Sequence, residues 1–283
     1  MAKTPHQVAY NFVERLAKDL QDARFELPAF PEAVLRVQRA LQCQETSAGD
    51  IVDILGSDAG LAARILRIAN SAAFRPASGE ITDLRNAVSR LGFNMVRTVA
   101  VDFAMRQLRR RDNYSATARD EIEAVWRDSL KVASLSFVIA KHYTDVNADQ
   151  ALLTGLLHGL GRLYIVMRAE EMSVVSETDI RAVADGWQAS IGKAILETWG
   201  LPEGLQHAVE HQDDRDTEPE IGDDGRITLT NILVAAKVLN SNPAGASNVP
   251  ALSWLNVMNE LDASAVLTQY DEEIEALRAS LGD

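Results

Sequence analysis

Apolar residues recur along most of the chain at the spacing of an amphipathic α-helix, and the strict alternation typical of a half-buried strand is nearly absent. The strongest signal is the nearly all-apolar stretch 149–168, which is expected to form one helix at the centre of the fold. Further helices are expected at about 6–22, 115–142, 186–199, 228–241 and 251–281. The pattern therefore predicts an all-α protein, built as a multi-helical bundle.

Polar residues and glycines mark helix boundaries in the N-terminal third of the chain. Asp58 has the position of an N-cap for a helix over 59–71, whose apolar stripe is expected to face the core. Arg64 and Arg67 are expected on the opposite side of that helix. Gly92 is expected to end the following helix, because glycine readily adopts the left-handed conformation that terminates helices.

Charge limits the classes of partner. The chain of 283 residues has 28 Lys and Arg against 41 Asp and Glu, a net charge of −13. An acidic surface repels phosphate groups, so general binding to nucleic acid or to anionic membranes is not expected. The run Arg106–Arg111 is a local exception, and a nucleotide or nucleic-acid contact there stays open as an alternative. No signal peptide is seen, and the uncharged run Val132–Ala140 is far short of the roughly 20 residues that span a bilayer, which predicts a cytoplasmic protein without a membrane span.

The segment Leu156–Leu163 contains a histidine followed by a glycine, His158 and Gly159. It resembles the core of the HD-type metal phosphohydrolases, in which an adjacent His-Asp pair ligates a metal. Glycine offers no carboxylate to a cation, so the motif is expected to be a scaffold without its metal chemistry. Restoring the acid alone, by Gly159→Asp, is not expected to rescue a site that lacks several ligands.

Several stretches, in order along the chain, resemble the HDOD family, the HD-related output domain of bacterial signalling proteins. They span about residues 25–240, and Gly60 departs from the apolar residue that the family prefers near that point. The resemblance implies two packed helical subdomains: an N-terminal extension 1–24, an N-terminal bundle 25–114, and a degenerate HD-like subdomain with C-terminal helices at 115–283. The family-motif residues, to which the resemblance gives a structural role, are Pro28, Asp58, Arg64, Asn70, Ser71, Arg90 and Gly92.

The same resemblance can be carried onto the metal site residue by residue. The positions that form the expected remnant pocket are Asp128, His158, Gly159, Trp187, His211 and Lys237. Only two or three of these side chains are potential metal ligands, and a protonated lysine offers a positive charge where a ligand needs a lone pair. The expected outcome is a pocket with no metal, no cofactor and no catalytic residue.

The histidines have simpler explanations than metal binding. His158 is expected to be a core histidine that bonds a carbonyl or a carboxylate, with Asp128 either its partner or a surface carboxylate. His207 and His211 lie one helical turn apart, a spacing compatible with a metal. Charge pairing with the acidic loop 213–224, which is expected to be solvated, is the simpler interpretation.

The function that follows is a non-catalytic signal-transduction or regulatory protein of bacterial type. It would act through contact with an unknown protein partner, or through a small ligand, at a cleft between the two subdomains. The first alternative is a divergent metal-dependent phosphohydrolase that uses Asp128, His158 and His211. The second is a nucleotide-binding or nucleic-acid-binding regulator that uses Arg106–Arg111.

Overall fold

The computed structural model describes residues 5–22, 32–43, 45–74, 79–109, 114–172, 177–219, 221–222, 226–241, 250–252, 254 and 265–282. Helices account for nearly all regular structure in these ranges, and an isolated antiparallel bridge between Ile221 and Ile227 is their only β-type pairing. The prediction of an all-α fold is confirmed. None of the described helices is both long and apolar enough to cross a membrane.

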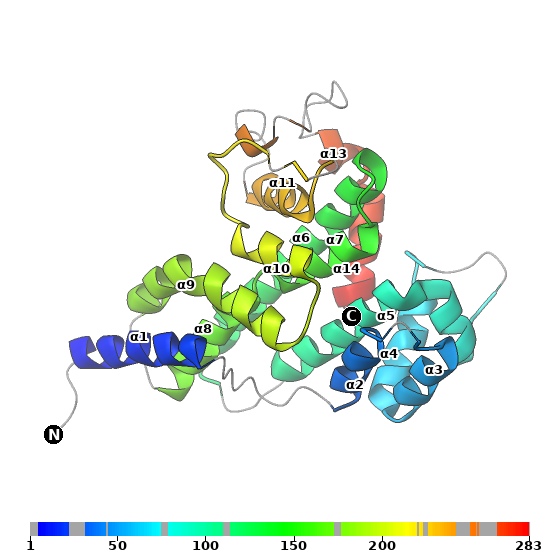
Figure 1. Cartoon of the computed structure of the whole chain (residues 1–283), viewed down its shortest axis with the longest axis horizontal. Helices are drawn as coiled ribbons and strands as arrows, with labels where there is room; N and C mark the ends of the chain where they lie inside the picture. The colour runs from blue at the N-terminus through cyan, green and yellow to red at the C-terminus, as the bar shows by residue number, and fades with distance from the viewer. Residues whose placement is uncertain are drawn as a thin grey trace.

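Four helices pack together at one end of the molecule (Figure 1). They are α2 (Glu32–Ala40), α3 (Ala48–Gly56), α4 (Ala59–Ala69) and α5 (Leu84–Arg109). Asp58 caps α4 as expected, because its Oδ1 accepts a hydrogen bond from Leu61 N at 3.0 Å. Gly92 divides α5 at a kink, where its φ of 74° lies in the left-handed region that favours glycine. The predicted end of a helix at Gly92 is therefore confirmed.

The second group of helices is built around the long helix α6 (Ala116–Tyr143), which packs against α7, α11 and α14. The helix α1 (Pro5–Gln21) lies at the far end of this group, beside α8 and α9 (Figure 1). The other elements are α7 (Ala148–Leu157), α8 (Leu160–Glu171), α9 (Glu177–Thr198), α10 (Glu203–Glu210), α11 (Leu229–Ser241), the short 3-10 helix η2 (Pro250–Leu252), α13 (Ala265–Gln269) and α14 (Asp271–Gly282).

The expectation of one helix over 149–168 is wrong. The chain turns at His158 and Gly159, between α7 and α8. The two helices dock on different partners at very short range: a Cβ at Gly155 would lie 2.5 Å from Ala133 Cα on α6, and one at Gly161 would lie 1.9 Å from Gln188 O on α9. The turn separates these two contacts, and apolar periodicity carries no information about such a turn.

The expectation of one helix over 251–281 is also wrong in the described part of the chain. A 3-10 turn occupies 250–252, and Tyr270 separates α13 from α14. Residues 255–264 of that segment lie outside the described residues. Val266 is buried against the core.

The two groups of helices are joined by a buried ionic cluster around the C-terminal helix. Arg64 Nε donates to Asp102 Oδ2 at 2.9 Å, and its Nη2 donates to the carbonyls of Ser280 and Leu281. Arg106 also binds Asp102 and the Leu281 carbonyl. The C-terminus accordingly lies beside α4 and α5 in Figure 1. Two packed groups agree with the expected architecture, and the limits 1–24, 25–114 and 115–283 stay a prediction.

The solvent-facing position expected for Arg64 is wrong, since only 5% of its side chain is exposed. Arg67, the other arginine of the helix, is exposed as expected. The amphipathic pattern of α4 predicts that a charged residue on its polar side is exposed to solvent, unless another element packs over that side. Here Asp102 of α5 and the carbonyl end of α14 cover one of the two.

Candidate functional site

His158 lies at the turn between α7 and α8 with 5% of its side chain exposed. Its Nδ1 is 2.7 Å from the carbonyl oxygen of Gly155, and its Nε2 is 3.3 Å from Asp128 Oδ2 on α6. A carbonyl only accepts, so Nδ1 carries a hydrogen. The other ring nitrogen, Nε2, faces the Asp128 carboxylate. Both expected partners of His158, a carbonyl and Asp128, are therefore present.

Asp128 is held from two sides. In addition to His158, Asn240 Nδ2 on α11 donates to its Oδ1 at 2.6 Å. Burial acts to raise the pKa of Asp128, but the hydrogen bonds from His158 and Asn240 and the nearby charge of Lys237 outweigh it and lower that pKa. About half of the Asp128 side chain, 52%, remains exposed, so this carboxylate is accessible to solvent.

Lys237 of α11 belongs to the same polar network. Its Nζ lies 2.7 Å from Gln212 Oε1 and 2.7 Å from Asp213 Oδ1, and 11% of its side chain is exposed. Gln212 in turn donates to the carbonyl of His158 at 3.2 Å. Burial is the largest influence on Lys237 and lowers its pKa, with Asp213 acting in the opposite direction. An ammonium group thus supplies the positive charge beside these carboxylates.

Gly159 faces α6 at close range. A Cβ built on this residue would lie 2.9 Å from Ser129 Oγ and 2.9 Å from Val125 Cγ1. Real Cβ atoms essentially never approach so closely, so the space that an aspartate needs is filled by side chains of α6. The HD-type scaffold implies a metal, and the residues present do not fit one: one ligand position is sterically closed and another is a lysine.

The remaining expected pocket residues lie elsewhere. Trp187 is half-buried on α9 against the hydrophobic core. His211 is the C-cap of α10, and its Nδ1 is 2.8 Å from Asp214 Oδ2. The structure therefore brings Asp128, His158 and Lys237 into one network, while the His211 ring bonds an acid of the following loop.

Sequence reasoning missed three members of this network, Gln212, Asp213 and Asn240. Asp213 is exposed, as expected for the acidic loop, and it also pairs with the buried Lys237. Asn240 follows Lys237 by three residues, which places both on one face of α11. This i, i+3 spacing was the only signal in the sequence, and it does not show that Asn240 reaches Asp128, because that contact depends on the packing of α11 against α6.

The family-motif residues have structural roles in the described part of the chain. Asn70 binds both the N–H and the carbonyl of Ile81, at 2.8 and 2.7 Å, and so closes the loop between α4 and α5. Arg90 donates to the carbonyl of Phe74, and Ser71 to that of Ile68. Pro28 lies outside the described residues.

Arg106, the first arginine of the run considered for nucleic-acid contact, and Arg97, on the same helix, are both bonded inside the protein. Arg106 binds Asp102 and the Leu281 carbonyl, and Arg97 donates to the Leu41 carbonyl at 3.2 Å. A nucleotide or nucleic-acid contact through the run Arg106–Arg111 stays untested, and these internal bonds already engage Arg106. The side chain of Arg109 and all of 110–111 lie outside the described residues.

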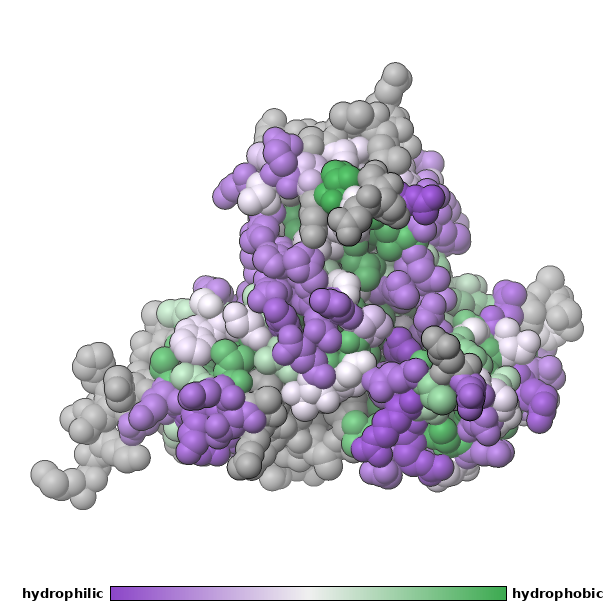
Figure 2. Space-filling view, viewed as in Figure 1, coloured by the Kyte–Doolittle hydropathy of each residue, from purple (hydrophilic) through white to green (hydrophobic). Residues whose placement is uncertain are grey.

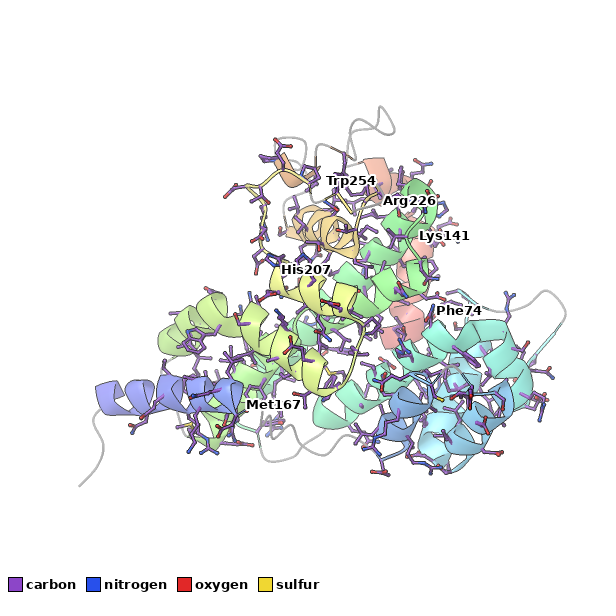
Figure 3. The ribbon with its side chains drawn as sticks, viewed as in Figure 1. Phe74, Lys141, Met167, His207, Arg226 and Trp254 are labelled. Carbon is purple, nitrogen blue, oxygen red and sulfur yellow. The ribbon has the colours of Figure 1, made fainter. Side chains whose placement is uncertain are left out.

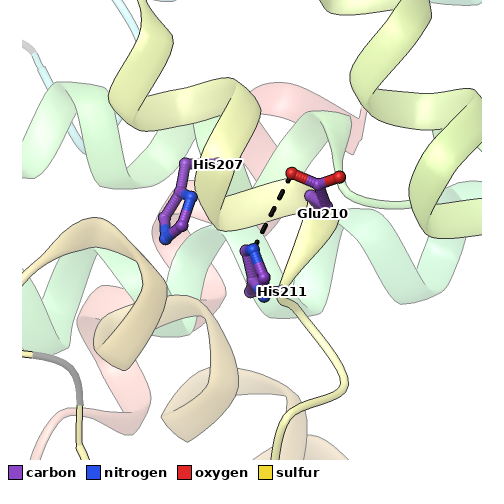
Figure 4. A group of neighbouring side chains, drawn as sticks. All are labelled: His207, Glu210 and His211. Carbon is purple, nitrogen blue, oxygen red and sulfur yellow. Dashed lines mark ion pairs between the residues drawn. The ribbon is translucent and has the colours of Figure 1, made fainter.

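A second cluster of polar side chains lies on α10. His207, Glu210 and His211 each offer one ligand atom, and these atoms lie within 4.8 Å of one another (Figure 4). Among the described residues, this is the one place where three potential metal ligands of the His, Cys, Asp or Glu type converge. The cluster includes His211 but neither His158 nor Asp128.

Comparison with known families decides the classification. The model of the HDOD domain matches residues 27–215, more than half of the chain. The chain belongs to the HDOD family. The match confirms the resemblance drawn from the ordered sequence motifs.

Solved structures share the fold of this HDOD protein. A protein of Shewanella amazonensis SB2B, provisionally named a metal-dependent phosphohydrolase, is 24% identical with a TM-score of 0.74, covering 97% of this chain and 99% of its own. An HDOD domain protein of unknown function from Geobacter sulfurreducens is 20% identical with a TM-score of 0.67. The match covers 95% of this chain and 97% of the Geobacter chain. A protein of Marinobacter aquaeolei VT8, provisionally named a signal transduction protein, is 20% identical with a TM-score of 0.60. The match covers 99% of this chain and 67% of the Marinobacter chain.

A curated relative is a considerably longer protein than this chain. An uncharacterised protein of Treponema pallidum (strain Nichols) is 26% identical over 224 residues, 73% of this chain. The match spans only 41% of the length of that relative. The HDOD chain thus corresponds to less than half of the larger protein.

A groove lies where the two groups of helices of the HDOD fold meet. Its volume is about 690 Å³, and it is lined by the residues after α4, by α6, and by α13 and α14. Phe74 and Lys141, both labelled in Figure 3, line it from the N-terminal bundle and from α6 respectively. Polar and charged side chains dominate the C-terminal side, where Lys141 pairs with Glu273.

Proposed function

We propose that this HDOD protein is a non-catalytic regulator of bacterial signal transduction, acting in the cytoplasm through a protein partner or a small ligand. One observation supports the proposal that the protein is non-catalytic. The position where the HD scaffold would have an aspartate is closed by Ser129 and Val125, and the Lys237 ammonium stands among the remaining acceptors. A cation would have to displace Lys237 and would find too few ligands.

The regulatory role rests on the family and on the groove between the two groups of helices. The Marinobacter relative is provisionally named a signal transduction protein. The groove joins residues that follow α4 to residues of α14, which are more than 190 positions apart in the chain. An occupant would contact both groups at once and so favour one relative placement of them.

A hydrolase assay tests the first half of the proposal. The purified protein would be supplemented separately with manganese, iron, zinc and magnesium, and assayed on phosphodiester and nucleotide substrates. We expect turnover no higher than that of the His158→Ala variant. Metal-dependent turnover that His158→Ala abolishes would contradict the proposal and support the alternative of a divergent phosphohydrolase, which the provisional name of the Shewanella relative favours.

A pair of surface variants tests the second half. Ala72 is exposed and lines the groove, whereas Ala63 is exposed on α4 and does not line it. Affinity capture from a bacterial lysate would be compared for Ala72→Arg and Ala63→Arg, with thermal unfolding of both. We expect Ala72→Arg to lose a partner that the wild type and Ala63→Arg retain. Equal capture by all three would exclude the groove as the partner site.

A further inference from the structure

We propose that His207, Glu210 and His211 form a binding site for a divalent transition-metal ion of the zinc class, separate from the remnant HD pocket. The three residues lie on one face at the end of α10, at positions i, i+3 and i+4 (Figure 4). Two imidazoles and one carboxylate are a ligand set that suits zinc, cobalt or nickel better than magnesium or calcium.

The three ligand atoms lie slightly farther apart than they would around a bound metal. His211 Nε2 lies 3.7 Å from Glu210 Oε2, and the His207 and His211 ring centroids are 4.3 Å apart with planes inclined at 42°. Ligand atoms about 2.0–2.1 Å from a tetrahedral metal lie about 3.4 Å from each other. The side chains would therefore close by rotamer adjustment of an ångström or so, without movement of the helix.

Asp214 provides a second, independent indication. Its Oδ2 lies 2.8 Å from His211 Nδ1, and because a carboxylate only accepts, Nδ1 carries the hydrogen. In the neutral ring, Nε2 then has a lone pair and is the nitrogen that faces Glu210. A carboxylate that fixes the tautomer and orientation of a ligating histidine in this way is a common outer shell of metal sites.

The site is open to solvent and lies in a negative environment. Two hollows, of about 260 and 580 Å³, both have His207 in their lining. Glu218 lines the first hollow and Glu203 the second, so further carboxylates are within the surroundings. Hydrophilic side chains dominate the surface over α10 in Figure 2. A fourth coordination position is left for water or another ligand.

Lys193 is the internal competitor of the metal. Its Nζ lies 2.7 Å from Glu210 Oε2, an oxygen that the metal would use. Removing this lysine frees the carboxylate and lowers the local positive charge. The affinity for a divalent cation should therefore rise in Lys193→Met, a result that a merely structural role of the cluster would not produce.

The test is titration of the untagged full-length protein with Co²⁺, followed by visible absorption, and with Zn²⁺ by equilibrium dialysis. We expect one ion per chain, with affinity lowered at least 10-fold in His207→Ala and in His211→Ala. Asp214→Asn should weaken binding by about 10-fold or more, as loss of an outer-shell partner does. His142→Ala, which removes a histidine that pairs with Glu273 on another surface, is the control and should bind normally.

Circular dichroism would establish that each variant is folded, and Glu210→Gln offers a milder change at the same site. Failure of the wild type to bind either ion would overturn the proposal. So would binding that persists in both His207→Ala and His211→Ala. Binding lost in His158→Ala but kept in those two variants would place the metal in the remnant pocket, and would count against the proposed function as well.

Discussion

Gly159 and Ser129 are packed so closely that a Cβ on the glycine would lie 2.9 Å from the serine Oγ. Val125 Cγ1 would lie at the same distance. A larger side chain at position 159 would therefore have to displace side chains of α6.

We therefore expect Gly159→Ala to lower the free energy of unfolding by about 1–3 kcal/mol through overpacking. Gly186→Ala is the matched control, because its Cβ would meet nothing within 4 Å in the middle of α9, and it should be neutral or stabilising by up to about 1 kcal/mol. Urea denaturation measures both. Gly159→Asp should gain no metal in the remnant pocket, and a folded Gly159→Asp protein with a new metal that depends on His158 would contradict this account.

Gly161 should tolerate substitution even less. A Cβ there would lie 1.9 Å from the backbone carbonyl of Gln188, which cannot move without shifting α9. We expect Gly161→Ala to cost about 3 kcal/mol or more, or to prevent folding. Gly204→Ala, with open space around its Cβ, serves as comparison. Equal thermal midpoints for the two variants would show that α8 and α9 are not in close contact.

Arg64→Met should destabilise the protein by about 3 kcal/mol, since it leaves Asp102 buried with one partner fewer, the Ser280 carbonyl without its arginine donor, and the Leu281 carbonyl with Arg106 alone. Arg67→Met, on the exposed side of the same helix, should change stability by no more than about 0.5 kcal/mol. Hydrogen exchange should accelerate in α14 only in the first variant. Similar exchange in both variants would mean that the cluster does not hold the C-terminal helix.

Lys237 gives the protein a characteristic pH dependence. Burial lowers its pKa, so the folded state binds this proton more weakly than the unfolded chain, where the pKa is about 10.4. The unfolded state then holds more protons, and stability rises with pH between the lowered pKa and about 10.4. We expect this alkaline rise to be lost in Lys237→Met and kept in the exposed Lys131→Met. Denaturant titrations at a series of pH values measure it, and parallel profiles for the wild type and Lys237→Met would refute it.

Local signals in the chain predicted much of the scaffold. Asp58 caps α4 and Gly92 kinks α5 where the sequence indicated, because a cap and a left-handed residue act within one turn. The family motifs were recognised because they lie in order along the chain, and the absence of an HD-type ligand at Gly159 stays a prediction. The pair of His158 with Asp128 was anticipated only as one of two alternatives, since they are 30 residues apart.

The amino-acid sequence by itself determined the all-α class, most helix positions and the HDOD family, because these depend on periodicity, capping and the order of motifs along the chain. Tertiary structure alone decided the turn at His158, the burial of Arg64 and the partners of Lys237. Each of these depends on which helix faces which: α7 and α8 meet different neighbours, Asp102 and the end of α14 enclose one arginine, and α11 brings an ammonium to Gln212 and Asp213. Contacts between distant segments are set by packing, and periodicity along a single helix does not encode them.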